Sequence, residues 1–403
     1  MLWLKIRTQE AILMKNILIV DDSALMRRTI SDIINSDEEL HNSKYAVNGE
    51  DALRILEAGE KFDAIVLDIN MPKMNGIEFL RALNMKGRKE RVVIVSTIAR
   101  EGAKETIQAL ELGAFDFITK PDSLSEAKGP SFGQRLIEML YAAIGLRTSE
   151  ASNEDVKRKL RPSAAKPGSF TGAGIGGTVA VRKPLDSGVR VCPGGVSDRS
   201  NHSKAPAGKG ARKLVALACS TGGPKALQYV IPFLPANLDA PVLIVQHMPE
   251  GFTSSLSKRL DELSKISVKE ASDGDVLKKG VVYIAKGGSQ MRLAEKSKSE
   301  HVVTVRKEAA RNGLKPCADI MYESLMETSF DEITCVVMTG MGADGTQGIL
   351  QLEKTNKVYV IGQDAESCTV YGMPKSIAET GAVDEVVTLK GIADAITKHV
   401  GVL

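Results

Sequence analysis

The chain alternates short apolar runs with amphipathic segments. In its first part the apolar runs lie at residues 16–20, 62–67 and 91–95, and segments with helical periodicity such as ALMRRTISDII separate them. Short apolar strands separated by helices are typical of a parallel sheet covered by helices on both faces. The pattern predicts an α/β domain with a doubly wound, flavodoxin-like parallel sheet at residues 14–140, preceded by an extension at residues 1–13.

A second series of apolar runs begins at residue 213. Its members lie at residues 213–219, 241–246, 281–285, 333–338 and 357–362. A helical pattern, KALQYVIPFL, follows the first of them at residues 225–234. We therefore expect a second doubly wound parallel-sheet domain, Rossmann-like in class, at residues 213–403.

The segment between the two series has a different composition. Residues 147–213 are rich in Gly, Pro and Ser and contain 14 Lys or Arg against 5 Asp or Glu. Such a segment cannot bury enough apolar surface to offset its ordering entropy. Phe170 is its only Phe, Tyr or Trp, and it has no amphipathic period, which argues against a nucleic-acid partner. We interpret residues 141–212 as a flexible basic linker.

Composition limits the class of protein further. The chain has five cysteines, an odd number, with no Cys-x-x-Cys pair, so neither a disulfide framework nor a zinc site is indicated. No apolar run approaches the roughly 20 residues needed to cross a bilayer. The first residues carry charges where a signal peptide has its apolar centre. We expect a cytoplasmic protein without membrane insertion.

Acidic residues follow two strand-like runs of the first domain. Asp21 and Asp22 follow the first run, and Asp68 follows a later one. Three carboxylates in the crevice at the strand ends would repel one another unless a cation such as Mg²⁺ neutralised them, and Asp68 is then a candidate nucleophile toward phosphorus. Ser96 and Lys120 end further runs and could bind phosphate oxygens. Each aspartate alone could instead cap a helix, but the ordered set favours a phosphorylation site.

Four motifs of the first domain, ILIVDDSALMR, IVLDINMPKMNGIEFL, VVIVST and LGAFDFITKP, resemble the receiver domain of two-component response regulators. The resemblance implies that Asp68 is the phosphoacceptor. It also implies a Mg²⁺ site formed by Asp68, Asp21, Asp22 and the backbone carbonyl of Asn70.

The same resemblance gives three residues roles in the response to phosphorylation. Ser96 would be the switch hydroxyl and Lys120 the cation that senses the phosphoryl group. Phe117 would be the aromatic residue that changes its packing, although this position is commonly Tyr. A chemotaxis histidine kinase is the implied phosphodonor.

The second domain places three reactive side chains after three different strand-like runs. Ser220 follows LVALAC and precedes two glycines and a predicted helix, where unpaired backbone N–H groups could stabilise an oxyanion. His247 follows the next run and could act as its base, and Asp344 follows another and could orient the imidazole. Alone, Ser220 could equally be an ordinary helix N-cap. The three together predict a serine hydrolase.

The motifs STGGPKAL, VLIVQHMPEGFT and VVMTGMGADGTQGI resemble the catalytic domain of chemotaxis protein-glutamate methylesterases. The resemblance implies hydrolysis of glutamate γ-methyl esters on methyl-accepting chemoreceptors, with possible deamidation of receptor glutamines and no cofactor in this domain. Ser220, His247 and Asp344 would be the catalytic triad. Thr221 and Met341 would lie near the site, with the backbone of Met341 as an oxyanion donor.

Two other outputs remain open from the sequence. A response regulator with a nucleic-acid-binding output would explain the receiver and the basic linker, but no helix-turn-helix pattern is present. A non-catalytic protein that docks on chemoreceptors would also contain both domains. We expect instead a hydrolase that phosphorylation activates.

Overall fold

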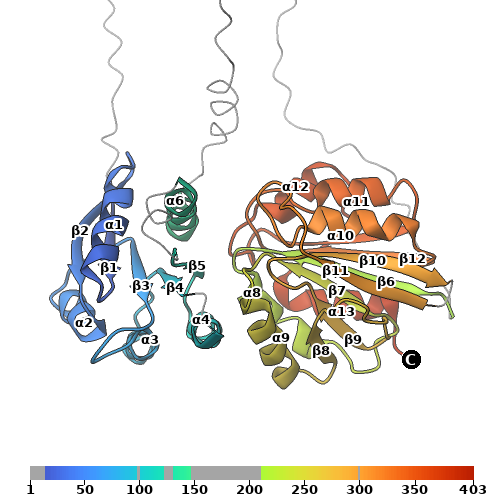
Figure 1. Cartoon of the computed structure of the whole chain (residues 1–403), viewed down its shortest axis with the longest axis horizontal. Coiled ribbons are helices and arrows are strands. Elements are labelled where there is room, and N and C mark those ends of the chain that lie inside the picture. Colours follow the sequence, from blue (N-terminus) through green and yellow to red (C-terminus); the bar gives the residue numbers. More distant parts are fainter. Residues whose placement is uncertain (1–13, 98–99, 122–129, 147–209, 298–299) are drawn as a thin grey trace, which may run out of the picture. The chain divides into compact units, whose positions relative to one another are not determined.

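The computed structural model describes residues 14–97, 100–121, 130–146, 210–297 and 300–403. The predicted extension at residues 1–13 and most of the predicted linker lie outside the described residues, so the predicted domain limits remain predictions. The described residues form two α/β parts, one before residue 147 and one after residue 209 in the sequence (Figure 1). Within the described residues, no helix is long and apolar enough to span a membrane.

The first part is a five-stranded parallel sheet in the order β2-β1-β3-β4-β5. Its strands are β1 (Lys15–Val20), β2 (Leu40–Ala46), β3 (Ala64–Asp68), β4 (Val92–Ser96) and β5 (Asp116–Thr119). Its helices are α1 (Ala24–Asn35), α2 (Gly49–Glu57), α3 (Gly76–Met85), α4 (Arg100–Glu111) and α6 (Pro130–Ile144). Helices α1 and α6 cover one face, and α2, α3 and α4 cover the other (Figure 1). This strand order is the flavodoxin-like one, as predicted.

Strand β1 has four consecutive buried apolar residues, 17–20, because helices cover both of its faces there. Ile17 and Ile19 pack toward α1 and α6, whereas Leu18 and Val20 pack toward α2 and α3. The edge strand β2 has the sequence LHNSKYA with mostly exposed positions. Its polar sequence explains why the hydrophobic pattern did not predict it.

The second part is a seven-stranded parallel sheet in the order β14-β13-β12-β6-β7-β9-β8. Its strands are β6 (Lys213–Cys219), β7 (Val242–Gln246), β8 (Ser267–Glu270), β9 (Val281–Ile284), β12 (Glu332–Val337), β13 (Val358–Gln363) and β14 (Glu385–Val387). An antiparallel hairpin of β10 (Gln290–Ser297) and β11 (Glu300–Arg306) was not predicted from the sequence. The predicted fold class of two doubly wound parallel-sheet parts is confirmed.

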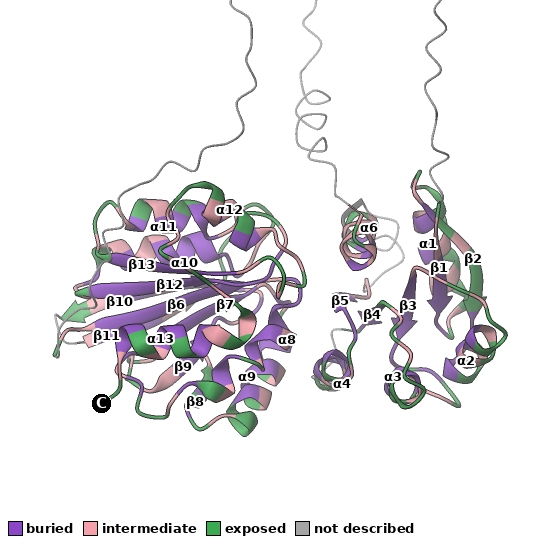
Figure 2. Cartoon of the chain, turned by 180° about the vertical axis from the view of Figure 1, so that it is seen from behind, coloured by how far each residue is buried: buried purple, intermediate pink, exposed green. Residues whose placement is uncertain are grey.

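Helices cover both faces of this sheet, and its central strands are buried (Figure 2). Helices α10 (Ala318–Ser324), α11 (Thr346–Leu352) and α12 (Met373–Glu379) lie on one face; α8 (Gly223–Leu227), α9 (Phe252–Leu263) and α13 (Ile392–Val400) lie on the other. Successive residues of β6 point to opposite faces: Leu214 and Ala216 toward the first set, and Val215 and Leu217 toward the second.

The helix predicted at residues 225–234 is wrong in length. Helix α8 ends at Leu227, and a separate 3₁₀ turn, η1 (Ile231–Phe233), follows. Pro232 prevents one continuous helix over this range, because it has no N–H to donate to the carbonyl of Gln228. The turn after β6 therefore carries only a short helix.

The strand order places a switch point beside β6. The chain leaves β6 for β7 on one side and later returns to β12 on the other side. In open parallel sheets, ligands bind at the carboxyl ends of the strands where the order reverses. The carboxyl ends of β6, β7 and β12 are therefore the expected location of a site.

Candidate active site

Ser220, His247 and Asp344 follow these three strands. Ser220 comes directly after β6, and its backbone N–H donates to the carbonyl of Thr339 at 3.0 Å. The N-cap of α8 is Gly222, without a side-chain cap. The interpretation of Ser220 as an ordinary helix N-cap is therefore wrong, and its hydroxyl has no capping role.

Neighbouring side chains pack closely against the two glycines that follow Ser220. Gly222 has φ +76°, and a Cβ there would lie 2.4 Å from the side chain of Thr369. A Cβ on Gly223 would lie 2.0 Å from Oε1 of Gln246. The packing of these side chains against the turn therefore requires glycine at both positions.

His247 and Asp344 are in direct contact. Nε2 of His247 lies 2.7 Å from Oδ2 of Asp344, and both side chains are largely buried. Because the carboxylate can only accept, Nε2 carries the proton, and Nδ1 of a neutral imidazole is left as an acceptor. Among the hydrogen bonds of the described residues, none joins His247 to Oγ of Ser220; such contacts often tighten only when substrate binds.

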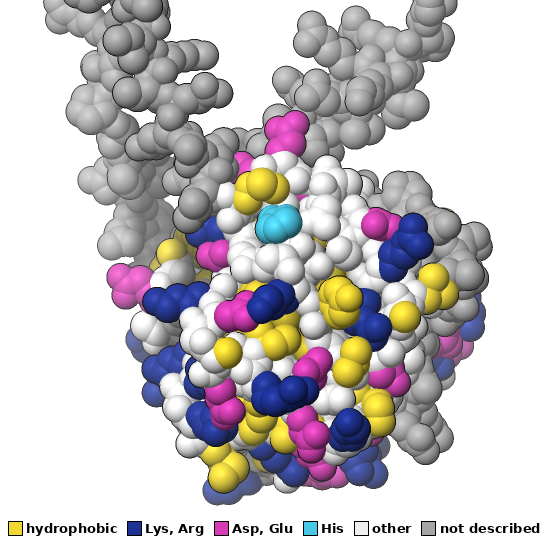
Figure 3. All heavy atoms as spheres, turned by 90° about the vertical axis from the view of Figure 1, so that its left-hand side faces the viewer, with side chains coloured by type: hydrophobic (Ala, Val, Ile, Leu, Met, Phe, Trp, Pro, Cys, Tyr) yellow, Lys and Arg dark blue, Asp and Glu magenta, His cyan; other side chains and the backbone are white. Residues whose placement is uncertain are grey.

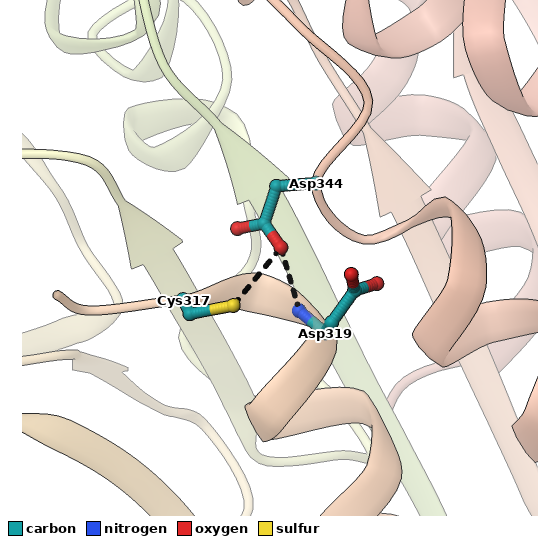
Figure 4. A group of neighbouring side chains, drawn as sticks. All are labelled: Cys317, Asp319 and Asp344. Atoms are coloured by element: carbon teal, nitrogen blue, oxygen red, sulfur yellow. Dashed lines mark hydrogen bonds between the residues drawn. The ribbon is translucent and has the colours of Figure 1, made fainter. Parts of the chain in front are cut away.

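The carboxylate of Asp344 also accepts hydrogen bonds from the start of α10. Oδ2 accepts from the backbone N–H of Ala318 at 2.6 Å, and Oδ1 accepts from that of Asp319 at 3.0 Å and from the thiol of Cys317 at 3.1 Å. Figure 4 shows the thiol and the Asp319 N–H pointing at the carboxylate. Sequence reasoning gave none of these donors a role.

These contacts keep Asp344 ionised. Burial alone would raise the pKa of its carboxyl, but the hydrogen bond and charge of His247, together with the donors of α10, lower the pKa well below its usual range. A carboxylate held in this state can orient an imidazole and stabilise its positive charge.

Cys317, Asp319 and Asp344 offer ligand atoms within 4.8 Å of one another, which is close enough for a metal ion. Their hydrogen bonds argue against that use. Burial raises the pKa of the Cys317 thiol to about 12, so the thiol keeps its proton. Oδ1 of Asp319 accepts from the backbone N–H groups of Gly345 and Gly348 at 3.0 and 2.7 Å. The cluster is a hydrogen-bonded support for Asp344.

Thr221 and Met341 lie on the two loops that border Ser220. The carbonyl of Thr221 accepts from Oγ1 of Thr339 at 2.9 Å, which holds the loop after β6. Met341 follows Gly340, where a Cβ would lie 2.8 Å from Cβ of Ser220. Within the described residues, the backbone N–H groups of Thr221 and Met341 donate to no protein acceptor. Their role as donors to a substrate oxygen remains a prediction.

The first part of the chain gathers the predicted acids at the carboxyl ends of its strands. Oxygen atoms of Asp21, Asp22 and Asp68 lie within 4.8 Å of one another. Nζ of Lys120 lies 2.8 Å from both Asp21 and Asp68. Burial raises the pKa of Asp68, and the Lys120 charge opposes this shift. Burial would lower the pKa of Lys120, but the two carboxylates raise it.

The remaining predicted receiver residues lie on the same sheet or directly after it. Ser96 is the last residue of β4, and its Oγ accepts a hydrogen bond from Oγ1 of Thr106 in α4 at 2.8 Å. Phe117 lies in β5, and Asn70 is an exposed residue in the loop after β3. Their predicted roles in phosphorylation remain predictions.

Known proteins match both parts of the chain. Residues 215–396 match the CheB methylesterase family, and residues 17–128 match the response regulator receiver domain. A protein-glutamate methylesterase/protein-glutamine glutaminase of Bacillus subtilis is 39% identical over 387 residues, which covers 96% of this chain and 99% of that protein. The chain belongs to the CheB methylesterase family. The carboxylic ester hydrolase class predicted from the sequence is thereby confirmed.

Other members are similarly related. The protein-glutamate methylesterase/protein-glutamine glutaminase 1 of Syntrophomonas wolfei is 38% identical over 385 residues and covers 95% of this chain and 98% of its own. The chain is also similar to the crystal structure of the Thermotoga maritima CheB methylesterase catalytic domain, with 39% identity, a TM-score of 0.45, and coverage of 47% of this chain and 98% of that one.

Proposed function

We propose that this methylesterase hydrolyses γ-methyl esters of glutamyl side chains on chemoreceptors and releases methanol. The observation that carries the proposal is the 2.7 Å hydrogen bond between His247 and Asp344 beside Ser220, with each residue following its own strand at one edge of the sheet. The names of the relatives support the substrate class.

In the proposed mechanism, Oγ of Ser220 attacks the ester carbonyl carbon while Nδ1 of His247 takes the hydroxyl proton. Asp344 stabilises the imidazolium that forms. The N–H groups of Thr221 and Met341 donate to the oxygen that becomes negative. Collapse of the tetrahedral intermediate expels methoxide, which leaves as methanol with the proton from His247.

The second half of the reaction releases the receptor glutamate. Water gives a proton to Nδ1 of His247 and attacks the acyl group on Ser220. The new tetrahedral intermediate expels Oγ of Ser220, which recovers its proton from His247. Glutamine would react along the same path with ammonia as the leaving group, and the double name of the relatives favours this second activity.

The proposed regulation begins at Asp68, which would accept a phosphoryl group from a chemotaxis histidine kinase. The oxygen atoms of Asp21, Asp22 and Asp68 suit Mg²⁺, a hard cation that prefers oxygen ligands, and the carbonyl of Asn70 would complete the protein ligands. The ion would neutralise charge during phosphoryl transfer. Ser96, Phe117 and Lys120 are the predicted responders. We propose a cytoplasmic location, where such a kinase acts.

No observation favours the two alternatives. The face drawn in Figure 3 mixes Lys and Arg with Asp and Glu, which does not indicate a nucleic-acid-binding surface. A non-catalytic docking protein would not need the buried contact between His247 and Asp344 or the donors arranged around it.

Methanol release from methylated chemoreceptor membranes tests the proposal. We expect Ser220→Ala to lower the rate by at least about 10⁴-fold, because the nucleophile is lost. Ser267→Ala, at an exposed serine in β8, is the matched control and should retain the wild-type rate. Methanol release by Ser220→Ala at the control rate would overturn the proposed nucleophile.

A further inference from the structure

Gln246, the last residue of β7, is a buried polar side chain next to the proposed site, 1% exposed. Its Nε2 donates to the carbonyl of Ser220 at 3.0 Å and to the carbonyl of His247 at 3.1 Å. One amide nitrogen therefore joins the backbone of the proposed nucleophile to that of the proposed base.

The other end of the amide contacts Cys219. Oε1 of Gln246 accepts from the thiol at 3.0 Å. Burial raises the pKa of the Cys219 thiol, so the sulfur keeps its proton and can donate. Because the two backbone carbonyls can only accept, the nitrogen must face them and the oxygen must face the thiol. The hydrogen bonds thus define a single orientation of the amide.

The space around this amide is filled. A Cβ on Gly223 would lie 2.0 Å from Oε1 of Gln246 and 3.1 Å from Cβ of Cys219. The side chain of Gln246 therefore contacts the end of β6 and the start of α8, and it is itself the last residue of β7. Closely packed protein interiors transmit small displacements. A change at Gln246 would therefore move the ends of β6 and β7, which precede Ser220 and His247.

We propose that Gln246 is a positioning residue that fixes the spacing of Ser220 and His247, and that Cys219 holds its amide in the required orientation. The proposal rests on the proposed catalytic roles of Ser220 and His247. The backbone N–H of His247 also donates to the carbonyl of Cys219 at 3.2 Å, but this hydrogen bond does not involve the Gln246 side chain. A displacement of about 1 Å between reacting groups can lower a rate by about 10²-fold.

Gln246→Glu in the full-length chain tests this role, because it keeps the shape and replaces the donor NH₂ by a carboxyl. The ionised carboxylate cannot donate to the two carbonyls, whereas the protonated acid can donate to one. We expect kcat for methanol release to fall by about 10- to 100-fold at pH 8 with KM changed less than about 2-fold. The ratio of the variant's kcat to the wild-type kcat should rise as the pH is lowered toward 6.

Gln363→Glu is the matched control. Gln363 is equally buried and ends β13, and its amide contacts Thr339 and Ser367 but neither Ser220 nor His247. Loss of the donor to Ser367 should lower kcat of this variant by less than about 3-fold at pH 8, because its amide nitrogen contacts neither Ser220 nor His247. An activity ratio for Gln246→Glu that stays constant across pH, or matches that of Gln363→Glu, would overturn the positioning role.

Cys219 gives a second measurement. Cys219→Ala removes the donor to Oε1 and should lower kcat by about 3- to 10-fold, and Cys219→Ser, which restores a donor, should recover most of it. Equal rates for the two variants would contradict the proposed orientation by the thiol. Failure of the proposed function is distinguishable, because wild-type methanol release would then not depend on Ser220 at all.

Discussion

The two parts of the chain each place a key aspartate at the carboxyl end of a parallel strand, but they hold its charge in opposite ways. Burial raises the pKa of Asp68, and a side-chain cation, Lys120, opposes this shift. The pKa of Asp344 is lowered despite burial, because His247 and the start of α10 donate to it. A flexible ammonium group can be exchanged for another cation, whereas backbone donors cannot be. The contact of Asp68 with Lys120 suits a site whose charge changes, whereas the donors around Asp344 suit a site whose carboxylate stays ionised.

The largest effect expected from this difference is that of Asp344→Asn. An amide at this position would place NH₂ or C=O groups against donors that require a carboxylate, and it would no longer favour the proton on Nε2 of His247. We expect kcat for methanol release to fall by about 10⁴-fold. The thermal midpoint of the full chain should also fall. A loss smaller than 10-fold would show that Asp344 does not orient the base.

Asp68→Asn should change stability in the opposite direction. The substitution removes a carboxylate whose ionised form is disfavoured by burial, so we expect the thermal midpoint to rise by on the order of 3 °C. Basal methanol release should stay within about 2-fold of wild type, and stimulation by acetyl phosphate should disappear. Thermal scans and the methanol assay measure both effects. A fall in the midpoint equal to that of Asp344→Asn would remove the contrast between the two sites.

The smallest effect should come from the thiol that donates to Asp344. Cys317→Ala removes one of several donors, so we expect kcat to fall by about 3- to 10-fold. Cys317→Ser keeps a hydroxyl donor and should remain near the wild-type rate. The same methanol assay at one pH separates the variants. If both variants behave alike, the hydrogen bond from Cys317 contributes nothing to the state of Asp344.

The hydrophobic pattern predicted both sheets because their central strands are buried on two faces and read as continuous apolar runs. The edge strands β2, β8 and β14 and the hairpin of β10 and β11 have polar or exposed positions and were missed. The placement of Ser220, His247 and Asp344 after neighbouring strands could be predicted because the carboxyl ends of parallel strands meet at one side of the sheet, whereas their catalytic roles remain predictions.

The contacts that support these residues could not be predicted in the same way. Gln246 reads as the end of an apolar strand, and the donors to Asp344 come from α10, which is distant in sequence from β7 and β12. Which atoms meet depends on how helices pack on the sheet, and hydrophobic periodicity does not contain that information. The length of α8 was wrong because the effect of Pro232 on the helical pattern was not taken into account.

The glycines around Ser220 have a consequence for protein engineering. A side chain at residue 222, 223 or 340 would overlap atoms of Thr369, Gln246 or Ser220 and Met373, respectively. A saturation library at these three positions should therefore contain almost no folded, active members other than the parent. Changes in substrate preference are expected from substitutions outside this turn, because the turn that carries Ser220 has no room for added side chains.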